Sequence, residues 1–184
     1  ENILIGSDVS FVFGYNLISR NNLEESAIDN LNSGGYIYIF PDQDEMFQEN
    51  DFFDFALFDQ SDMKFTEYDS ESYYLIKNND ILDANIKEIL NNDNKNSGLF
   101  KLYKHFQFNT NQSPYILVDG RSIWNVMSVG TGKLNIIGFT PTLEWTDFPL
   151  KANFIALVDE LINSSGYVEN KTLEVGDFYT TTEK

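Results

Sequence analysis

The chain has 184 residues, 42% of them hydrophobic and 15% aromatic, which is enough to build one sizeable core. Its 29 acidic residues outnumber 12 basic ones, and the formal charge of −17 would repel a nucleic-acid backbone or an anionic lipid surface. Because it contains no cysteine, disulfides, thiolate metal sites and a cysteine nucleophile are excluded.

The first part of the chain predicts a strand, a helix and a second strand. Residues 8–14 form a mostly apolar run typical of a strand. Helical spacing follows in four apolar residues: Leu23, Ala27, Ile28 and Leu31. Gly34 and Gly35 would end the helix and turn the chain into the β-rich run Tyr36–Phe40, which Pro41 closes. Short links between these elements predict that the two strands are parallel.

The middle of the chain is acidic and rich in phenylalanine. We expect residues 41–68 to form short helices over a sheet edge, with a strand near residues 64–68. Residues 73–76 read as a further strand, 81–90 as a short helix and 91–97 as a polar loop.

The second half predicts a series of strands and one helix. The expected strands are residues 101–108, 115–119, 122–129 and 133–139. Asp119-Gly120 and Gly130-Thr131-Gly132 are turn sequences between the last three, so we expect those three to form antiparallel hairpins. A helix should follow the loop at 140–149, with this apolar face: Leu150, Phe154, Leu157, Val158, Leu161 and Ile162. Pro149 and Gly166 suit its two ends.

Three segments resemble one known family. They are Gly34–Pro41, Ser122–Lys133 and Glu144–Leu157, in which Trp145, Asp147, Pro149 and Phe154 form the most specific pattern. Over residues 8–165 the chain resembles the class I glutamine-amidotransferase-like α/β domain of the Bat (aerotolerance-type) double-transmembrane bacterial proteins. The resemblance implies a three-layer, Rossmann/flavodoxin-like mixed sheet with an antiparallel hairpin portion. It makes structural anchors of Gly34, Gly35, Gly130, Gly132, Trp145, Asp147, Pro149 and Phe154.

The resemblance also implies a setting. Residues 1–165 would form the amidotransferase-like domain, with its first strand missing or replaced, and residues 166–184 a tail or the start of a following segment. The domain would stand on the periplasmic side of the bacterial inner membrane, anchored by segments outside this chain, with other envelope proteins as partners. Amidotransferases of this fold use a cysteine nucleophile with a downstream histidine and glutamate, and this chain has no cysteine.

Two short motifs have ordinary structural explanations. Gly130-Thr131-Gly132-Lys133 is similar to the end of a phosphate loop, but the first required glycine is replaced by Met127 and a strand follows. A hairpin turn explains it better. Asp8-Val9-Ser10 is similar to part of a von Willebrand A metal motif, but Val12 stands at the third ligand position, so we favour capping of a strand edge.

Acidic residues after the second strand are the weak candidates for a metal site. Asp42, Asp44 and Glu45, with Glu49 and Asp51, offer the oxygen ligands that calcium prefers, and they follow a strand end where α/β sheets often bind ligands. They lack the spacing of a calcium-binding loop. We therefore favour a solvated acidic rim with no bound cofactor or metal.

The remaining candidates are His105 and Trp145. His105 is the only imidazole, and no Gly-x-Ser-x-Gly sequence exists to present a serine to it, so a structural or exposed role is favoured over catalysis. Trp145 precedes a helix and is expected to anchor its loop, while Thr146 and Asp147 could cap the helix start.

These observations lead to a ranked set of functions. The leading hypothesis is a non-catalytic protein-interaction or scaffold domain of a membrane-anchored envelope protein. One alternative is an acidic ligand-binding or calcium-binding module that uses Asp42 and Asp44. The other is an enzyme, either a degenerate amidotransferase-like one or a hydrolase or transferase with His105 beside a nucleophile.

Overall fold

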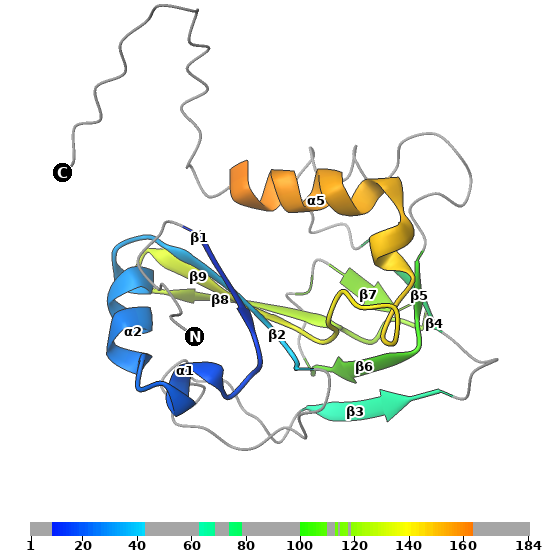
Figure 1. Ribbon diagram of the computed structural model, residues 1–184, viewed down its shortest axis with the longest axis horizontal. Coiled ribbons are helices and arrows are strands. Elements are labelled where there is room, and N and C mark those ends of the chain that lie inside the picture. The colour runs from blue at the N-terminus through cyan, green and yellow to red at the C-terminus, as the bar shows by residue number, and fades with distance from the viewer. Residues whose placement is uncertain are drawn as a thin grey trace, which may run out of the picture.

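A mixed four-stranded sheet forms the centre of the molecule (Figure 1). The computed structural model describes residues 9–42, 63–68, 74–78, 100–109, 113, 115–117 and 119–163. The strand order is β1-β2-β9-β8, with β1 at Val9–Phe13, β2 at Tyr36–Phe40, β9 at Gly132–Ile137 and β8 at Trp124–Val129. β1, β2 and β9 run parallel to one another, and β8 is antiparallel to β9. The expected α/β class with a mixed sheet is confirmed.

The predicted βαβ unit is present. The helix α2 (Glu24–Asn32) connects the parallel strands β1 and β2, and Gly34 turns the chain between them with a φ of 99°. Glycine tolerates this φ because it has no Cβ. A short helix, α1 (Leu17–Arg20), precedes α2 and was not predicted.

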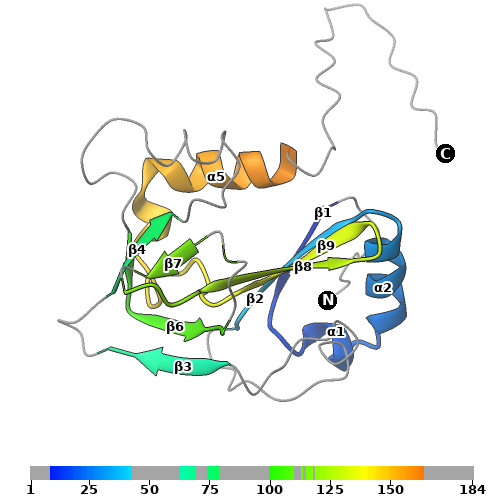
Figure 2. The same cartoon turned by 180° about the vertical axis from the view of Figure 1, so that it is seen from behind.

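Helices lie on both faces of the central sheet. Side chains alternate along a strand, so Ile39 and Phe40 of β2 point to opposite faces. The face of Ile39 packs against α2, whose Ala27 and Leu31 are fully buried. The face of Phe40 looks toward α5 (Ala152–Asn163), which lies on the other side of the sheet in both ribbon views (Figure 2).

The strand predicted at residues 101–108 is in fact two strands in different sheets. β5 (Lys101–Leu102) pairs with β4 (Tyr74–Asn78), and β6 (Lys104–Gln107) pairs with β3 (Lys64–Glu67), both antiparallel. The break falls at Tyr103, whose N–H donates to the carbonyl oxygen of Trp145 at 2.8 Å. A backbone bond to a distant loop thus interrupts an otherwise continuous β-rich run.

Only one of the two predicted hairpins forms. The β8–β9 hairpin is confirmed, with Gly130 and Thr131 as its loop. β7 (Tyr115–Leu117) pairs with β4 and not with β8, so the hairpin expected at Asp119-Gly120 is wrong. The chain does turn there, because Gly120 N–H donates to the Leu117 carbonyl, but the strand that follows belongs to the central sheet.

The predicted C-terminal helix begins later than expected. Pro149 lies in the separate 3-10 turn η2 (Phe148–Leu150), and α5 starts at Ala152. Leu150 was expected on the apolar face of the helix but is 72% exposed in η2. The expectations for residues 43–62, 81–97 and the chain beyond 163 lie outside the described residues, as does Asp8. No helix among the described residues is long and apolar enough to cross a bilayer.

Close backbone contact at the start of β9 should make Gly132 intolerant of any side chain. An added Cβ would stand 2.2 Å from the Gly35 carbonyl oxygen and 2.5 Å from that of Leu31. Gly132→Ala should lower the free energy of unfolding by about 1–3 kcal/mol, because backbone on both sides resists movement. Urea unfolding measures this. The control Ser128→Ala, on the exposed part of β8, should change it by less than about 0.5 kcal/mol; equal effects would contradict the explanation.

Candidate functional site

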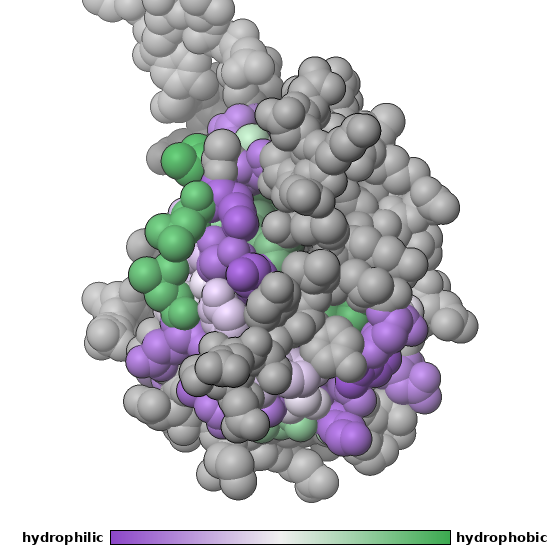
Figure 3. All heavy atoms as spheres, turned by 90° about the vertical axis from the view of Figure 1, so that its right-hand side faces the viewer, coloured by the Kyte–Doolittle hydropathy of each residue, from purple (hydrophilic) through white to green (hydrophobic). Residues whose placement is uncertain are grey.

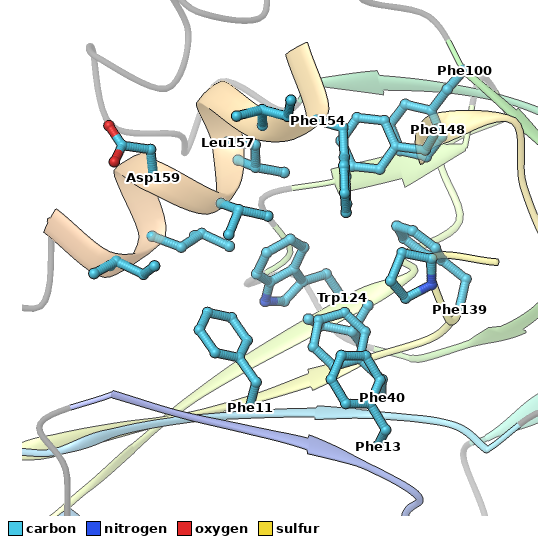
Figure 4. A pocket seen from close by; sticks show the side chains of 16 residues that line it. Phe11, Phe13, Phe40, Phe100, Trp124, Phe139, Phe148, Phe154, Leu157 and Asp159 are labelled. Carbon is cyan, nitrogen blue, oxygen red and sulfur yellow. The ribbon is translucent and has the colours of Figure 1, made fainter. Parts of the chain in front are cut away.

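An aromatic groove lies between the central sheet and α5 (Figure 4). It encloses about 530 Å³, which is within the range of roughly 300–1,000 Å³ typical of ligand sites. Residues from β1, β2, β8, β9, η2 and α5 line it, together with Phe100, Phe139 and Pro141. We call this feature the α5 groove.

Phenylalanines of the two N-terminal strands form the floor of the α5 groove. The two-residue period of a strand puts Phe11 and Phe13 of β1 on one face, beside Phe40 of β2. Phe13 stacks on Phe40 with ring centroids 4.8 Å apart, yet remains 49% exposed. β1 is an edge strand of the described sheet, so no neighbouring strand of that sheet covers Phe13 from outside. Trp124 stands between this floor and α5 (Figure 4).

A second aromatic cluster closes the end of the α5 groove near η2. Phe148 stacks on Phe100 at 3.9 Å between ring centroids and meets Phe154 edge-on at 5.2 Å. Leu157 and Leu161 of α5 are buried one turn apart. These contacts hold α5 at a fixed distance from the sheet. The space left between α5 and the sheet is the groove.

One stripe of α5 forms the outer rim. Ile155, Asp159 and Ile162 are four and three residues apart, so they share one side of the helix. Ile155 is 76% exposed, and Asp159 is the only charged residue among the described ones that border the groove. The Asp159 carboxylate is turned away from the floor (Figure 4), and the Asn163 side-chain amide donates to it at 3.2 Å. The rim therefore alternates apolar and acidic surface.

Exposed apolar residues continue beyond the α5 groove toward η2. Leu143 and Leu150 are both exposed, and Leu150 is separated from α5 only by Lys151. Figure 3, which looks at that end of the molecule, shows a strip of hydrophobic residues bordered by hydrophilic ones. Large exposed apolar areas with a polar border are typical of binding surfaces.

The chemistry of the lining is that of binding. The side chains of its described lining residues offer dispersion and apolar burial, and among them the one ionisable group, Asp159, is at the rim. The α5 groove can therefore hold an apolar group by contact.

Of the acidic candidates for calcium binding, the structure describes Asp42 alone. Asp42 is exposed just beyond the carboxyl end of β2, while Asp44, Glu45, Glu49 and Asp51 lie outside the described residues. Within the described part of the chain, no three histidine, aspartate or glutamate side chains gather as metal ligands do.

His105 is fully buried in β6. Its ring stacks on Tyr68 with centroids 5.7 Å apart, and Thr66 lies opposite it across the β3–β6 pair. The pKa of His105 is lowered from 6.5 to about 4, mainly by burial and also by the positive charge of Arg121, while the negative charge of Asp119 opposes both effects. The imidazole is thus neutral at pH 7 and a weak proton acceptor there.

Of the family-pattern residues near α5, Trp145 is buried, whereas Asp147, Pro149 and Phe154 are partly exposed. Trp145 is 2% exposed, with its ring centroid 5.9 Å from that of Phe65 and 6.2 Å from that of Phe106. The expected role of Asp147 as a helix cap is wrong, because its carboxylate accepts from the Lys101 N–H at 2.7 Å.

The expected role of Thr146 at the start of the helix is partly met. Its Oγ1 accepts from the Phe148 N–H at 3.1 Å, within η2 and before α5 begins. The same hydroxyl donates to the Lys101 carbonyl oxygen at 2.7 Å. Thr146 therefore fixes the loop against β5 and also supports the turn that leads into α5.

The glycine anchors also meet in space. Lys133 N–H donates to the Gly35 carbonyl oxygen at 3.0 Å, which brings the turn after α2 against the β8–β9 hairpin. A Cβ on Gly130 would stand 2.7 Å from the Asn32 Cα, so both glycines of the hairpin turn lie against the end of α2.

Sequence reasoning identified the apolar face of α5 but did not single out the strand residues that form the floor of the α5 groove. Phe11, Phe13 and Phe40 sit in strands where aromatic residues usually indicate core. The available signal was the period of two that places Phe11 and Phe13 on one face. On α5, the available signal was Ile155, an apolar residue that lies outside the predicted apolar face of the helix.

Comparisons with known proteins bear on the fold. The cytoplasmic protein STM1381 from Salmonella typhimurium LT2 is similar with a TM-score of 0.59 at 10% identity, covering 88% of this chain and 73% of that one. The β-galactosidase from Rahnella sp. R3 gives 0.51 at 11% identity, covering 89% of this chain but only 24% of that one. No family model and no curated protein matches the sequence. At these identities the likeness shows an α/β fold alone.

Removing the indole of Trp145 should destabilise the whole domain. The indole is buried against β3 and β6, and the backbone of its own loop bonds to Tyr103. Trp145→Ala therefore leaves a cavity. We expect a loss of about 3–5 kcal/mol in the free energy of unfolding, measured by urea or thermal denaturation. Trp145→Phe, which keeps most of the volume, should lose less than half as much; an unchanged midpoint in Trp145→Ala would show that the side chain is not an anchor.

Protonation of His105 should weaken the fold as pH falls. The pKa is about 4 in the folded protein and near 6.5 in an unfolded chain, so the unfolded state binds the proton more tightly between these values. Stability should therefore decline from about pH 6.5 toward pH 4, by about 3 kcal/mol from this group. His105→Phe keeps a ring against Tyr68 and removes the titration. Subtracting its unfolding free energies from those of the wild type isolates the effect, and parallel pH profiles would contradict it.

Proposed function

We propose that this chain is a non-catalytic protein-interaction domain that binds partner proteins through the α5 groove. The observation that carries the proposal is an aromatic cavity of about 530 Å³ whose rim residue Ile155 is 76% exposed. Burying such a surface is favourable by about 25 cal/mol per Å² of apolar area. A hydrophobic centre with a charged border is the usual anatomy of a protein interface.

We further infer that the domain is of the class I glutamine-amidotransferase-like kind found in the Bat family. Three features support this inference: the parallel strands β1, β2 and β9, the antiparallel hairpin at β8, and helices on both sides of the sheet. These are also features of a three-layer, Rossmann/flavodoxin-like arrangement. The pattern from Trp145 to Phe154 adds sequence support.

The proposed setting follows from the same family. The domain would stand on the periplasmic side of the bacterial inner membrane, held by segments outside this chain, with other envelope proteins as partners. A charge of −17 supports protein partners over nucleic acid or anionic lipid.

Several observations support a binding role over an enzymatic one. The chain has no cysteine to serve as the nucleophile of a true amidotransferase. His105 is buried and neutral, and it lies in β6, which contributes no side chain to the α5 groove.

Site-specific photo-cross-linking in intact cells tests the proposal. A photoreactive amino acid in place of Ile155 stands at the rim of the α5 groove, and the same amino acid in place of Glu25 stands on α2, on the opposite side of the sheet. We expect protein adducts from position 155 at least severalfold above those from position 25, because partners desolvate the groove and not α2. Equal yields at the two positions would sink the proposal.

A further inference from the structure

We propose that the α5 groove accepts a basic amphipathic helix, which inserts apolar side chains between α5 and the sheet and places a lysine or arginine against Asp159. This inference rests on the proposed interaction function and names the chemistry of its partner. The apolar floor of the groove supports a helical partner, and the acidic rim supports a basic one.

The absence of polar groups in the floor favours a helical partner. An extended peptide would bring backbone N–H and C=O groups over Phe11, Phe13 and Phe40, none of whose side chains can bond them. Each unpaired backbone group would weaken binding roughly tenfold or more. A helix satisfies its own backbone and offers an apolar stripe, as in other complexes of a helix in a groove.

Charges at the rim favour a cationic partner. Asp159 and Glu160 lie near the C-terminal end of α5, where the helix dipole is negative, and the last turn contains no basic residue. The neutral side-chain amide of Asn163 donates to the Asp159 carboxylate. A lysine or arginine of the partner would reduce the repulsion between these two carboxylates. It would also interact favourably with the negative end of the helix dipole.

The net charge also argues against a second copy of this chain as the occupant. Two molecules that each carry −17 repel one another at long range, whereas a basic segment is attracted and guided to the acidic rim. The same repulsion disfavours an apolar anion such as a fatty acid.

Three designed peptides of about 18 residues, or five helical turns, test the inference. The first is an amphipathic helix with lysines flanking its apolar stripe, and the second has glutamate at those flanks. The third scrambles the lysine peptide so that the stripe is lost. Fluorescence anisotropy with the 184-residue chain measures affinity, and circular dichroism measures helicity on binding. We expect the lysine peptide to bind as a helix at least tenfold more tightly than either of the others.

Two matched variants separate specific pairing from general attraction. Asp159→Asn should weaken the lysine peptide about threefold, a change typical of an exposed ion pair. Glu25→Gln removes the same charge from α2 and should have less than half that effect. Ile155→Ser, at a highly exposed position that should tolerate the change, should weaken the lysine peptide about tenfold by removing rim contact.

The outcomes distinguish this inference from the function beneath it. Equal affinity for the lysine and glutamate peptides, or equal effects of Asp159→Asn and Glu25→Gln, would overturn the cationic partner. Binding with a β-type spectrum, as when a strand pairs with the edge of β1, would overturn the helix. Either result leaves cross-linking at position 155 intact, whereas loss of that cross-linking removes the interaction function itself.

Discussion

The parallel pairing of β2 with β9 holds the two halves of the chain together. Tyr36 pairs with Lys133 and Ile39 with Ile136, so the βαβ unit joins a hairpin nearly a hundred residues later. Both faces of the sheet depend on this register. On one face it sets the row of isoleucines beneath α2, and on the other it aligns Phe40 with Ile137 beneath α5. A slip by one residue would exchange the two faces and remove the floor of the α5 groove.

Local patterns predicted the elements of this sheet well. The spacing of Ala27 and Leu31 identified α2, and turn sequences at Gly34 and Gly130 placed the ends of β2, β8 and β9. The errors arose where distant backbone groups decided the outcome. Tyr103 breaks a continuous β-rich run because its N–H bonds to Trp145, more than forty residues later. Likewise β7 pairs with β4 and not with its neighbour in sequence. Propensity carries no information about such partners.

The α5 groove could not be predicted for a related reason. Sequence shows that Phe13 and Phe40 belong to one side of neighbouring strands, but not how completely a later helix will cover them. That depends on the bulk between α5 and the sheet, where Phe148 and Phe154 meet edge-on and Phe100 stacks against Phe148. Packed rings at one end act as a spacer, because interiors at native density do not collapse around them. The volume of the groove is thus a property of tertiary packing.

Some residues of α5 are not those that would best stabilise the domain by itself. A helix selected only to cover the sheet would place polar residues on its outer stripe and basic residues in its last turn. α5 instead exposes Ile155 and carries Asp159 and Glu160 near its C-terminal end, each choice costing a fraction of a kcal/mol in an isolated domain. Its inner stripe, with Leu157 and Leu161 buried, follows the usual rules. Such departures are what the proposed binding role would require, since a partner that covers Ile155 and neutralises the acids would offset their cost.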